Sequence, residues 1–154
     1  MSLISFKDIK QLLGAYRARN FKLVFTNGCF DLLHTGHLDL LSNAAAFGDK
    51  LFVGLNSDTS VKKLKGDSRP IQNEKTRAQK LLELKYVNHV IIFEDLTPQK
   101  LVHAISPDVL VKGGDYKKNE IVGAKHVISS GGVVKIVPLT PGFSTTSIIE
   151  KSSN

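Results

Sequence analysis

The architecture of this chain is set by the sequence Phe25-Thr26-Asn27-Gly28-Cys29-Phe30-Asp31-Leu32-Leu33-His34-Thr35-Gly36-His37. A segment of β-branched and aromatic residues stops at a glycine turn, and a helix is expected directly after it. Two imidazoles, those of His34 and His37, stand three residues apart at the start of that helix. Helix N-termini attract anions because their first backbone N–H groups have no intrahelical partner. The stretch therefore predicts a phosphate site with reactive side chains.

Length and composition favour one soluble domain over residues 1–154. Hydrophobic residues make up 42% of the chain and charged residues 23%, and no apolar run approaches the ~20 residues of a membrane span. The first residues lack the pattern of a secretory signal, so a cytoplasmic location and no membrane partner are expected. Cys29 is the only cysteine, which excludes an intramolecular disulfide and a multi-cysteine zinc site.

Helices and strands are expected to alternate along the chain. The patterns predict helices near residues 5–19, 38–48, 73–85, 97–105 and 120–129, and strands near 21–26, 51–55, 87–93, 109–111 and 133–137. Strands rich in Val, Ile and Leu that alternate with helices indicate a parallel sheet covered on both faces. The expected fold is a Rossmann-like three-layer α/β sandwich with a five-stranded parallel sheet. Its site should lie beyond the carboxyl ends of the strands, where the histidine pair stands.

The histidine pair has three interpretations. Histidines at positions i and i+3 of a helix share a face, with Cβ atoms roughly 5–6 Å apart, so both rings can reach one phosphate. A zinc pair is an alternative, although no Glu follows His34 and no third ligand stands nearby, so no metal ligands are predicted. A pair satisfied within the core is the other alternative. The Gly-rich signatures of dehydrogenases and P-loop phosphotransferases are missing from the sequence.

Basic residues concentrate in one window, residues 61–80, within a chain of net charge +7. The window holds seven basic side chains and two acidic ones. A solvated face, a nucleic-acid surface and an arm that closes over a polyphosphate substrate are all compatible with this charge. No aromatic residue interleaves with the basic ones, so stacking on single-stranded nucleic acid, and hence a nucleic-acid partner, is not expected.

The segment from Gly28 to His37 resembles the His-x-Gly-His signature of the nucleotidyltransferase superfamily that includes the cytidylyltransferases. Four later segments narrow this resemblance: residues 56–66, Arg69-Pro70, residues 111–116 and residues 142–149. Together they resemble the adenylyltransferase domain that makes ADP-heptose from D-glycero-β-D-manno-heptose 1-phosphate. The resemblance extends from about residue 21 to residue 151. It implies transfer of AMP from ATP to a sugar 1-phosphate, with Mg²⁺ arriving on the ATP, and a homodimer.

The resemblance also implies roles for individual residues. Catalytic positions fall on His34, His37 and Lys63. Nucleotide-binding positions fall on Gly28, Cys29, Phe30, His34, Gly36, His37, Lys65, Ser144, Thr145 and Thr146. Sugar-phosphate positions fall on Asp31, Lys63, Arg77, Lys112 and Asp115. For three of these assignments a structural role is the alternative: Asp31 can orient its turn, Arg77 can be an exposed helix arginine, and Ser144 to Thr146 can be an ordinary helix cap.

Other activities remain open within and outside this reaction class. Glycerol-phosphate cytidylyltransferase and FAD synthetase share the reaction type. Leu139 stands where glycerol-phosphate enzymes carry an arginine, which weakens the cytidylyl interpretation. A non-catalytic nucleic-acid-binding module that uses residues 61–80 is the candidate from a different class.

Overall fold

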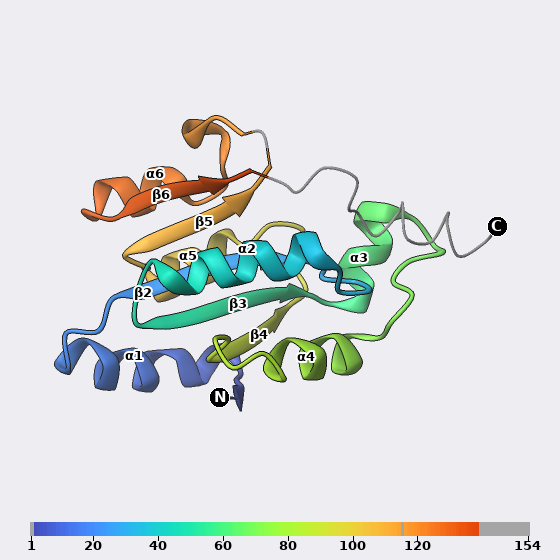
Figure 1. Cartoon of the computed structure of the whole chain (residues 1–154), viewed down its shortest axis with the longest axis horizontal. Helices are drawn as coiled ribbons and strands as arrows, with labels where there is room; N and C mark the ends of the chain where they lie inside the picture. The colour runs from blue at the N-terminus through green and yellow to red at the C-terminus, as the bar shows by residue number, and fades with distance from the viewer. Residues whose placement is uncertain (1, 115, 139–154) are drawn as a thin grey trace.

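A computed structural model describes residues 2–114 and 116–138 as a parallel sheet with helices on both faces (Figure 1). The strand order is β1-β4-β3-β2-β5-β6, and every neighbouring pair is parallel. The strands are β1 (Ser2–Leu3), β2 (Leu23–Gly28), β3 (Lys50–Asn56), β4 (His89–Phe93), β5 (Val109–Gly113) and β6 (Val133–Val137). The predicted three-layer α/β class is therefore confirmed.

The sheet has six strands, and the expectation of five was wrong by one. The additional strand, β1, pairs Ser2 with His89 and Leu3 with Val90 at the edge of the sheet. Two residues are too few for an alternation of apolar and polar positions to show in the sequence. The other five strands lie where they were expected, with boundaries shifted by up to two residues.

The described helices are α1 (Ile9–Ala18), α2 (Thr35–Ala46), α3 (Asp58–Lys65), α4 (Glu74–Leu82), α5 (Gln99–Ile105) and α6 (Ala124–Ser129), with 3₁₀ turns η1 (Phe6–Asp8) and η2 (Lys118–Glu120). Helix α3 was not predicted, because only Ser60 and Val61 of its residues are buried and its apolar pattern is faint. The single helix expected over residues 120–129 is instead η2 followed by α6. Gly123, at φ +88°, separates the two, and a Cβ there would lie 2.7 Å from Val102 of α5.

Alternate residues of the central strands face two separate hydrophobic cores. Val24 of β2 and Leu51 of β3 pack toward α2 and α4. Their neighbours Phe25 and Phe52 pack toward the opposite face, which α1, α5 and α6 cover. Both faces are thus buried, which explains the uninterrupted apolar runs of these strands.

The chain order changes direction at β2. From β2 the chain builds outward through β3 and β4, and then crosses over to place β5 on the other side of β2. Ligands of open α/β sheets bind at such a point, beyond the carboxyl ends of the strands. The turn after β2 therefore carries the signature residues into the expected crevice. No helix within the described ranges is both long and apolar enough to cross a membrane.

Candidate active site

The turn between β2 and α2 is tightly constrained. Phe30 (φ +46°) and Leu32 (φ +54°) both adopt the left-handed conformation, which costs roughly 1–2 kcal/mol for each non-glycine residue. The Phe30 ring is buried and lies edge-on to the His37 ring, with centroids 5.4 Å apart. A Cβ on Gly28 would lie 3.1 Å from the Phe30 ring. Packing of this ring thus holds the turn in shape and fixes one side of His37.

His34 and His37 form one hydrogen-bonded unit at the start of α2. His34 is the N-cap residue, and its Nδ1 accepts hydrogen bonds from the N–H groups of Gly36 (3.1 Å) and His37 (3.4 Å). In return, the His34 N–H donates to Nδ1 of His37 at 3.4 Å. The two rings stack with centroids 3.8 Å apart and planes 20° from parallel. Because each Nδ1 is an acceptor, this network assigns the proton of each neutral imidazole to Nε2.

Both imidazoles are neutral at pH 7. Burial, with smaller contributions from the neighbouring His34 and Lys65, lowers the pKa of His37 to about 4. Burial also lowers the pKa of His34. Each ring is therefore uncharged, and its Nε2–H group can donate a hydrogen bond to an anion. An approaching phosphate stabilises the protonated form, so negative charge developing at the site would raise both pKa values.

Asp31 ties the signature turn to the loop before α4. It is 1% exposed, and its carboxylate accepts hydrogen bonds from the N–H groups of Ile71 (2.7 Å) and Gln72 (3.0 Å). Charge-assisted hydrogen bonds from a carboxylate to two successive backbone N–H groups hold a loop firmly. The structure thus gives Asp31 the orienting role that sequence analysis considered beside substrate binding.

Arg77 joins three loops from the inside of the protein. Its side chain has no exposed surface, and its Nη1 donates to the carbonyls of Cys29 (2.8 Å) and Asn56 (2.7 Å). Its Nε donates to the Gln72 carbonyl at 2.9 Å, and its Nη2 forms an ion pair with Asp58 at 2.8 Å. These carbonyls belong to the turn after β2, the end of β3 and the loop before α4.

This placement differs from the predicted contact between Arg77 and a phosphate. A planar guanidinium that is bonded to three carbonyls and one carboxylate has its fork directed into the protein. The physical reason is that three strand and loop ends converge here with carbonyls that need donors. We therefore describe Arg77 as a residue that positions the site and does not include it among the substrate contacts.

A cleft of about 520 Å³ adjoins the signature turn. Its walls come from the ends of β2, β3 and β5, from the end of α3, from the loop before α5 and from the segment around η2. The residues that line it are Asn27, Gly28, Cys29, Asn56, Leu64, Lys65, Leu96, Thr97, Pro98, Lys112, Tyr116, Glu120, Ile121 and Val122. The volume is within the range of small-molecule sites. Predicted site residues from three separate segments therefore meet at one cleft: Gly28, Cys29, Lys65 and Lys112.

The charged groups of this cleft differ in their exposure to water, and Lys65 and Glu120 are exposed. Lys112 is half-buried, and burial lowers the pKa of its ammonium group. Its Nζ lies 5.5 Å from the centroid of the Tyr116 ring, a distance at which the ring face attracts a cation. Burial raises the pKa of the Cys29 thiol, so this group is not a nucleophile at neutral pH. The lysines are accordingly the groups that can bind an anion in the cleft.

The sequence model of a protein family described as Cytidylyltransferase-like matches residues 25–151 of this chain. The chain belongs to this family. It is 51% identical over 149 residues to the bifunctional protein HldE of Koribacter versatilis, a match that covers 97% of this chain and 31% of that protein. It is 49% identical over 149 residues to the HldE of Haemophilus influenzae, with the same coverage of 97% and 31%. The chain thus spans about a third of the length of these curated relatives.

Two solved structures resemble this cytidylyltransferase-like chain. The lipopolysaccharide core biosynthesis protein of Thermoplasma volcanium is 32% identical, with a TM-score of 0.63 over 78% of this chain and 97% of that one. The pantoate-beta-alanine ligase of Francisella tularensis, crystallised with beta-gamma ATP and beta-alanine, is 17% identical, with a TM-score of 0.62 over 98% of this chain and 73% of that one. The second likeness concerns the fold alone.

Within the cytidylyltransferase-like site, Lys63 and Lys65 differ in their position relative to the cleft. Both are exposed residues of α3, but two positions on a helix differ by about 200° in direction, so they do not share a face. Lys65 lines the cleft and its charge lowers the pKa of both His37 and Cys29, whereas Lys63 does not belong to the lining. The structure therefore places Lys65, and not Lys63, beside the histidine pair.

Four predicted site residues lie outside the described part of the chain: Asp115, Ser144, Thr145 and Thr146. Within residues 2–114 and 116–138, no three His, Cys, Asp or Glu side chains gather as a metal-binding group. The described residues thus supply no protein cage for a divalent ion.

Sequence analysis missed several cleft residues, among them Asn27, Asn56, Thr97 and Glu120. For Asn27 and Asn56 a signal existed, because each stands at the carboxyl end of a central strand. Thr97 was assigned to a helix start, and Pro98 is the N-cap residue of α5 instead. Glu120 was assigned to a helix that the structure interrupts.

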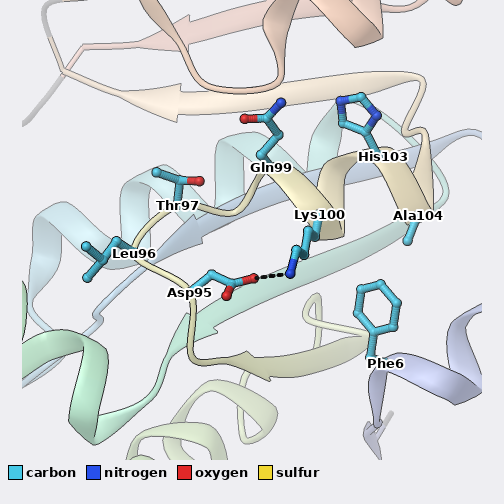
Figure 2. A pocket seen from close by; sticks show the side chains of 8 residues that line it. All are labelled: Phe6, Asp95, Leu96, Thr97, Gln99, Lys100, His103 and Ala104. Carbon is cyan, nitrogen blue, oxygen red and sulfur yellow. Dashed lines mark ion pairs between the residues drawn. The ribbon is translucent and has the colours of Figure 1, made fainter.

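A larger hollow lies on the other side of the loop before α5 (Figure 2). This open groove of about 910 Å³ runs between η1 and α5, from Leu96 and Thr97 to Phe6 and Ala104. Leu96 and Thr97 also line the smaller cleft, so their loop separates the two. The groove contains neither signature histidine nor Lys65 nor Lys112, and it is not the site described above.

Proposed function

We propose that this chain is an adenylyltransferase that transfers AMP from ATP to D-glycero-β-D-manno-heptose 1-phosphate, and so forms ADP-heptose and pyrophosphate. The observation that carries the reaction type is the stacked pair His34 and His37, two neutral Nε2–H donors at a helix N-terminus beside a cleft lined by Lys65 and Lys112. The choice of acceptor and base rests on the resemblance of residues 56–66 and 111–116 to the ADP-heptose enzymes, and is supported by the 51% identity to an HldE protein.

The reaction is an in-line displacement at the α-phosphorus of ATP. A phosphate oxygen of the sugar phosphate forms the new P–O bond, and the bond to the β-phosphate oxygen breaks, so pyrophosphate leaves with that electron pair. Such a transfer needs positioning and neutralisation of charge, and no covalent enzyme intermediate. His34 and His37 would donate to the oxygens of the reacting phosphates, where charge increases in the transition state.

The backbone and the lysines would bind the phosphate groups of the two substrates. The positive end of the α2 dipole and the close approach allowed by Gly36 suit the triphosphate. Lys65, near His37, would neutralise phosphate charge at the reacting centre, and the half-buried Lys112 would bind the phosphate of the acceptor. The backbone of Gly28, Cys29 and Phe30 borders this space. Ser144 to Thr146 and Asp115 keep the nucleotide or substrate roles that the resemblance implies, whereas Lys63, which does not line the cleft, is given no role in the reaction.

Magnesium would arrive with the nucleotide. The described residues offer no cluster of three ligands, whereas the phosphates of ATP bind Mg²⁺ themselves. The ion would supply neutralisation of the triphosphate, and no step is assigned to a protein-bound metal. A homodimer is proposed on the resemblance; a molar mass in solution near 16.9 kDa would contradict the dimer.

The experiment is a grid of nucleotides against acceptors with pyrophosphate release as the readout. We expect turnover with ATP and the heptose 1-phosphate. Turnover with CTP and glycerol phosphate, or with ATP and FMN, would instead identify the two rival activities. No turnover with any sugar 1-phosphate would overturn the proposal.

A further inference from the structure

Charges of opposite sign line the cleft without forming ion pairs across it. Lys65 reaches the cleft from the end of α3, and Lys112 from the end of β5. Glu120 belongs to η2, which packs against β6 and α6 at the other side of β5. The ion pairs found among the described residues are Arg17–Asp108, Arg77–Asp58 and Lys100–Asp95. The Glu120 carboxylate and both ammonium groups are therefore available to a ligand.

The arrangement gives the cleft a cationic part and an anionic part. The cationic part adjoins the histidine pair, since the charge of Lys65 acts on His37 and Lys112 lies close enough to act on Cys29. Glu120 is exposed and shares its wall with the apolar residues Ile121 and Val122. An ionised carboxylate only accepts hydrogen bonds, so it pairs with hydroxyl donors and repels a phosphate.

We propose that Glu120 selects the acceptor by its uncharged end. The inference rests on the proposed function: the acceptor enters with its 1-phosphate at Lys112 and Lys65 and with its distal hydroxyl groups at Glu120. A sugar that carries a second phosphate at the distal end would bring that phosphate against the carboxylate. Glu120 thus determines specificity for sugar monophosphates over sugar bisphosphates, partly by attraction of the correct ligand and partly by repulsion of the wrong one.

Binding measurements test this role without requiring turnover. Heptose 1-phosphate and the same sugar with a second phosphate on its far end are titrated calorimetrically into the chain, each in the presence of a non-hydrolysable ATP analogue. We expect the wild-type chain to prefer the monophosphate, and the preference to fall by about tenfold or more in Glu120→Gln, which corresponds to roughly 1.4 kcal/mol. Glu120→Lys should go further and favour the bisphosphate.

Glu83→Gln is the matched control. Glu83 is an exposed residue at the end of α4 that does not line the cleft, and the substitution removes the same charge. It should leave the preference unchanged, so a change common to both variants would reflect net charge alone and would overturn the proposal. An unchanged preference in Glu120→Gln and Glu120→Lys, with both variants folded by circular dichroism, would also overturn it.

Pyrophosphate release on the same samples separates this proposal from the proposed function. A chain that shows the predicted binding preference and its loss in Glu120→Gln, yet transfers no AMP, supports the role of Glu120 and overturns the adenylyltransferase activity. A chain that turns over heptose 1-phosphate with an unaltered preference in both Glu120 variants retains the activity and overturns the role of Glu120.

Discussion

The backbone N–H of His34 donates to the Nδ1 of His37, and the backbone N–H of His37 donates to the Nδ1 of His34, each at 3.4 Å. The two residues of the signature therefore hold each other's rings through the first turn of α2. This reciprocal bonding explains why the histidines stand three residues apart, because N-cap and N3 are the positions whose side chains and N–H groups face one another. The same bonding leaves the two Nε2–H groups as the donors of the pair.

His34 has a structural and a chemical role that substitution can separate. His34→Asn keeps a side-chain acceptor at the N-cap but removes the Nε2–H donor. We expect it to retain stability within a few tenths of a kcal/mol and to lose roughly 10²–10³ in kcat. His34→Ala should lose the activity and also about 1 kcal/mol of stability. Thermal unfolding and pyrophosphate release check both variants; equal stability of the Ala and Asn variants would contradict the capping role.

Acid should destabilise the fold before its carboxylates titrate. Burial lowers the pKa of His37 and of His89 to about 4, whereas the unfolded chain protonates them near 6.5. Between these values the unfolded chain binds more protons, so the free energy of unfolding falls as the pH decreases from about 6.5 to about 4. Carboxylates contribute mainly below about pH 5, so a falling melting temperature between pH 6.5 and 5 reports the imidazoles.

Substitution of His37 provides the control for this pH dependence. His37→Asn removes one of the two strongly shifted groups, and its melting temperature should decline less steeply over the same interval. His89 remains in that variant. Its Nδ1 lies 3.1 Å from the Ser2 hydroxyl oxygen, and its Nε2 lies 2.6 Å from the Tyr16 hydroxyl oxygen. A flat melting temperature between pH 6.5 and 5 in the wild-type chain would contradict the neutral state of both imidazoles.

Local signals in the sequence were sufficient for the histidine pair and for most of the fold. The turn after β2, the start of α2 and the five longer strands depend on neighbouring residues and on simple alternation, which a sequence displays directly. Helix α3 has a capping residue at Ser57, which is a signal for a helix start. It was missed because only a narrow face of the helix is buried, so its apolar pattern is weak. Its last five residues lay within the basic window and were interpreted by their charge.

The part that sequence could not supply is the direction of individual charged side chains. Arg77, Lys63 and Lys65 look equivalent in the window from residue 61 to residue 80. Only the assembled fold shows that carbonyls of three segments meet around Arg77 and accept its hydrogen bonds, and that α3 turns Lys65 toward the cleft. Glu120 escaped attention for the same reason, because its relation to the lysines depends on the crossover that places β5 beside β2.

Arg77 should prove essential for stability as well as activity. Arg77→Lys keeps the charge but loses the planar fork, so buried carbonyls of Cys29, Asn56 and Gln72 lose donors. We expect a loss of roughly 3–5 kcal/mol in the free energy of unfolding, measured by urea denaturation. Lys80→Arg, a charge-conserving exchange at an exposed position of the same helix, should stay within about 0.5 kcal/mol. A stable Arg77→Lys chain with a raised KM for ATP would restore the phosphate contact predicted from sequence.

Lys65 and Lys63 should differ sharply in their contribution to the reaction. Lys65→Met retains the length of the side chain and removes a charge that lies at the cleft beside His37, so we expect a decrease of roughly 10²–10³ in kcat with little change in stability. Lys63→Met removes the same charge from the same exposed helix, on a side directed about 200° away, and should change kcat by less than about threefold. The two variants are matched in net charge, so general electrostatic attraction of ATP affects both equally. Single-turnover rates of pyrophosphate release at saturating ATP measure the difference, and equal losses in both variants would mean that α3 rotates or unwinds to bring both lysines to the phosphates.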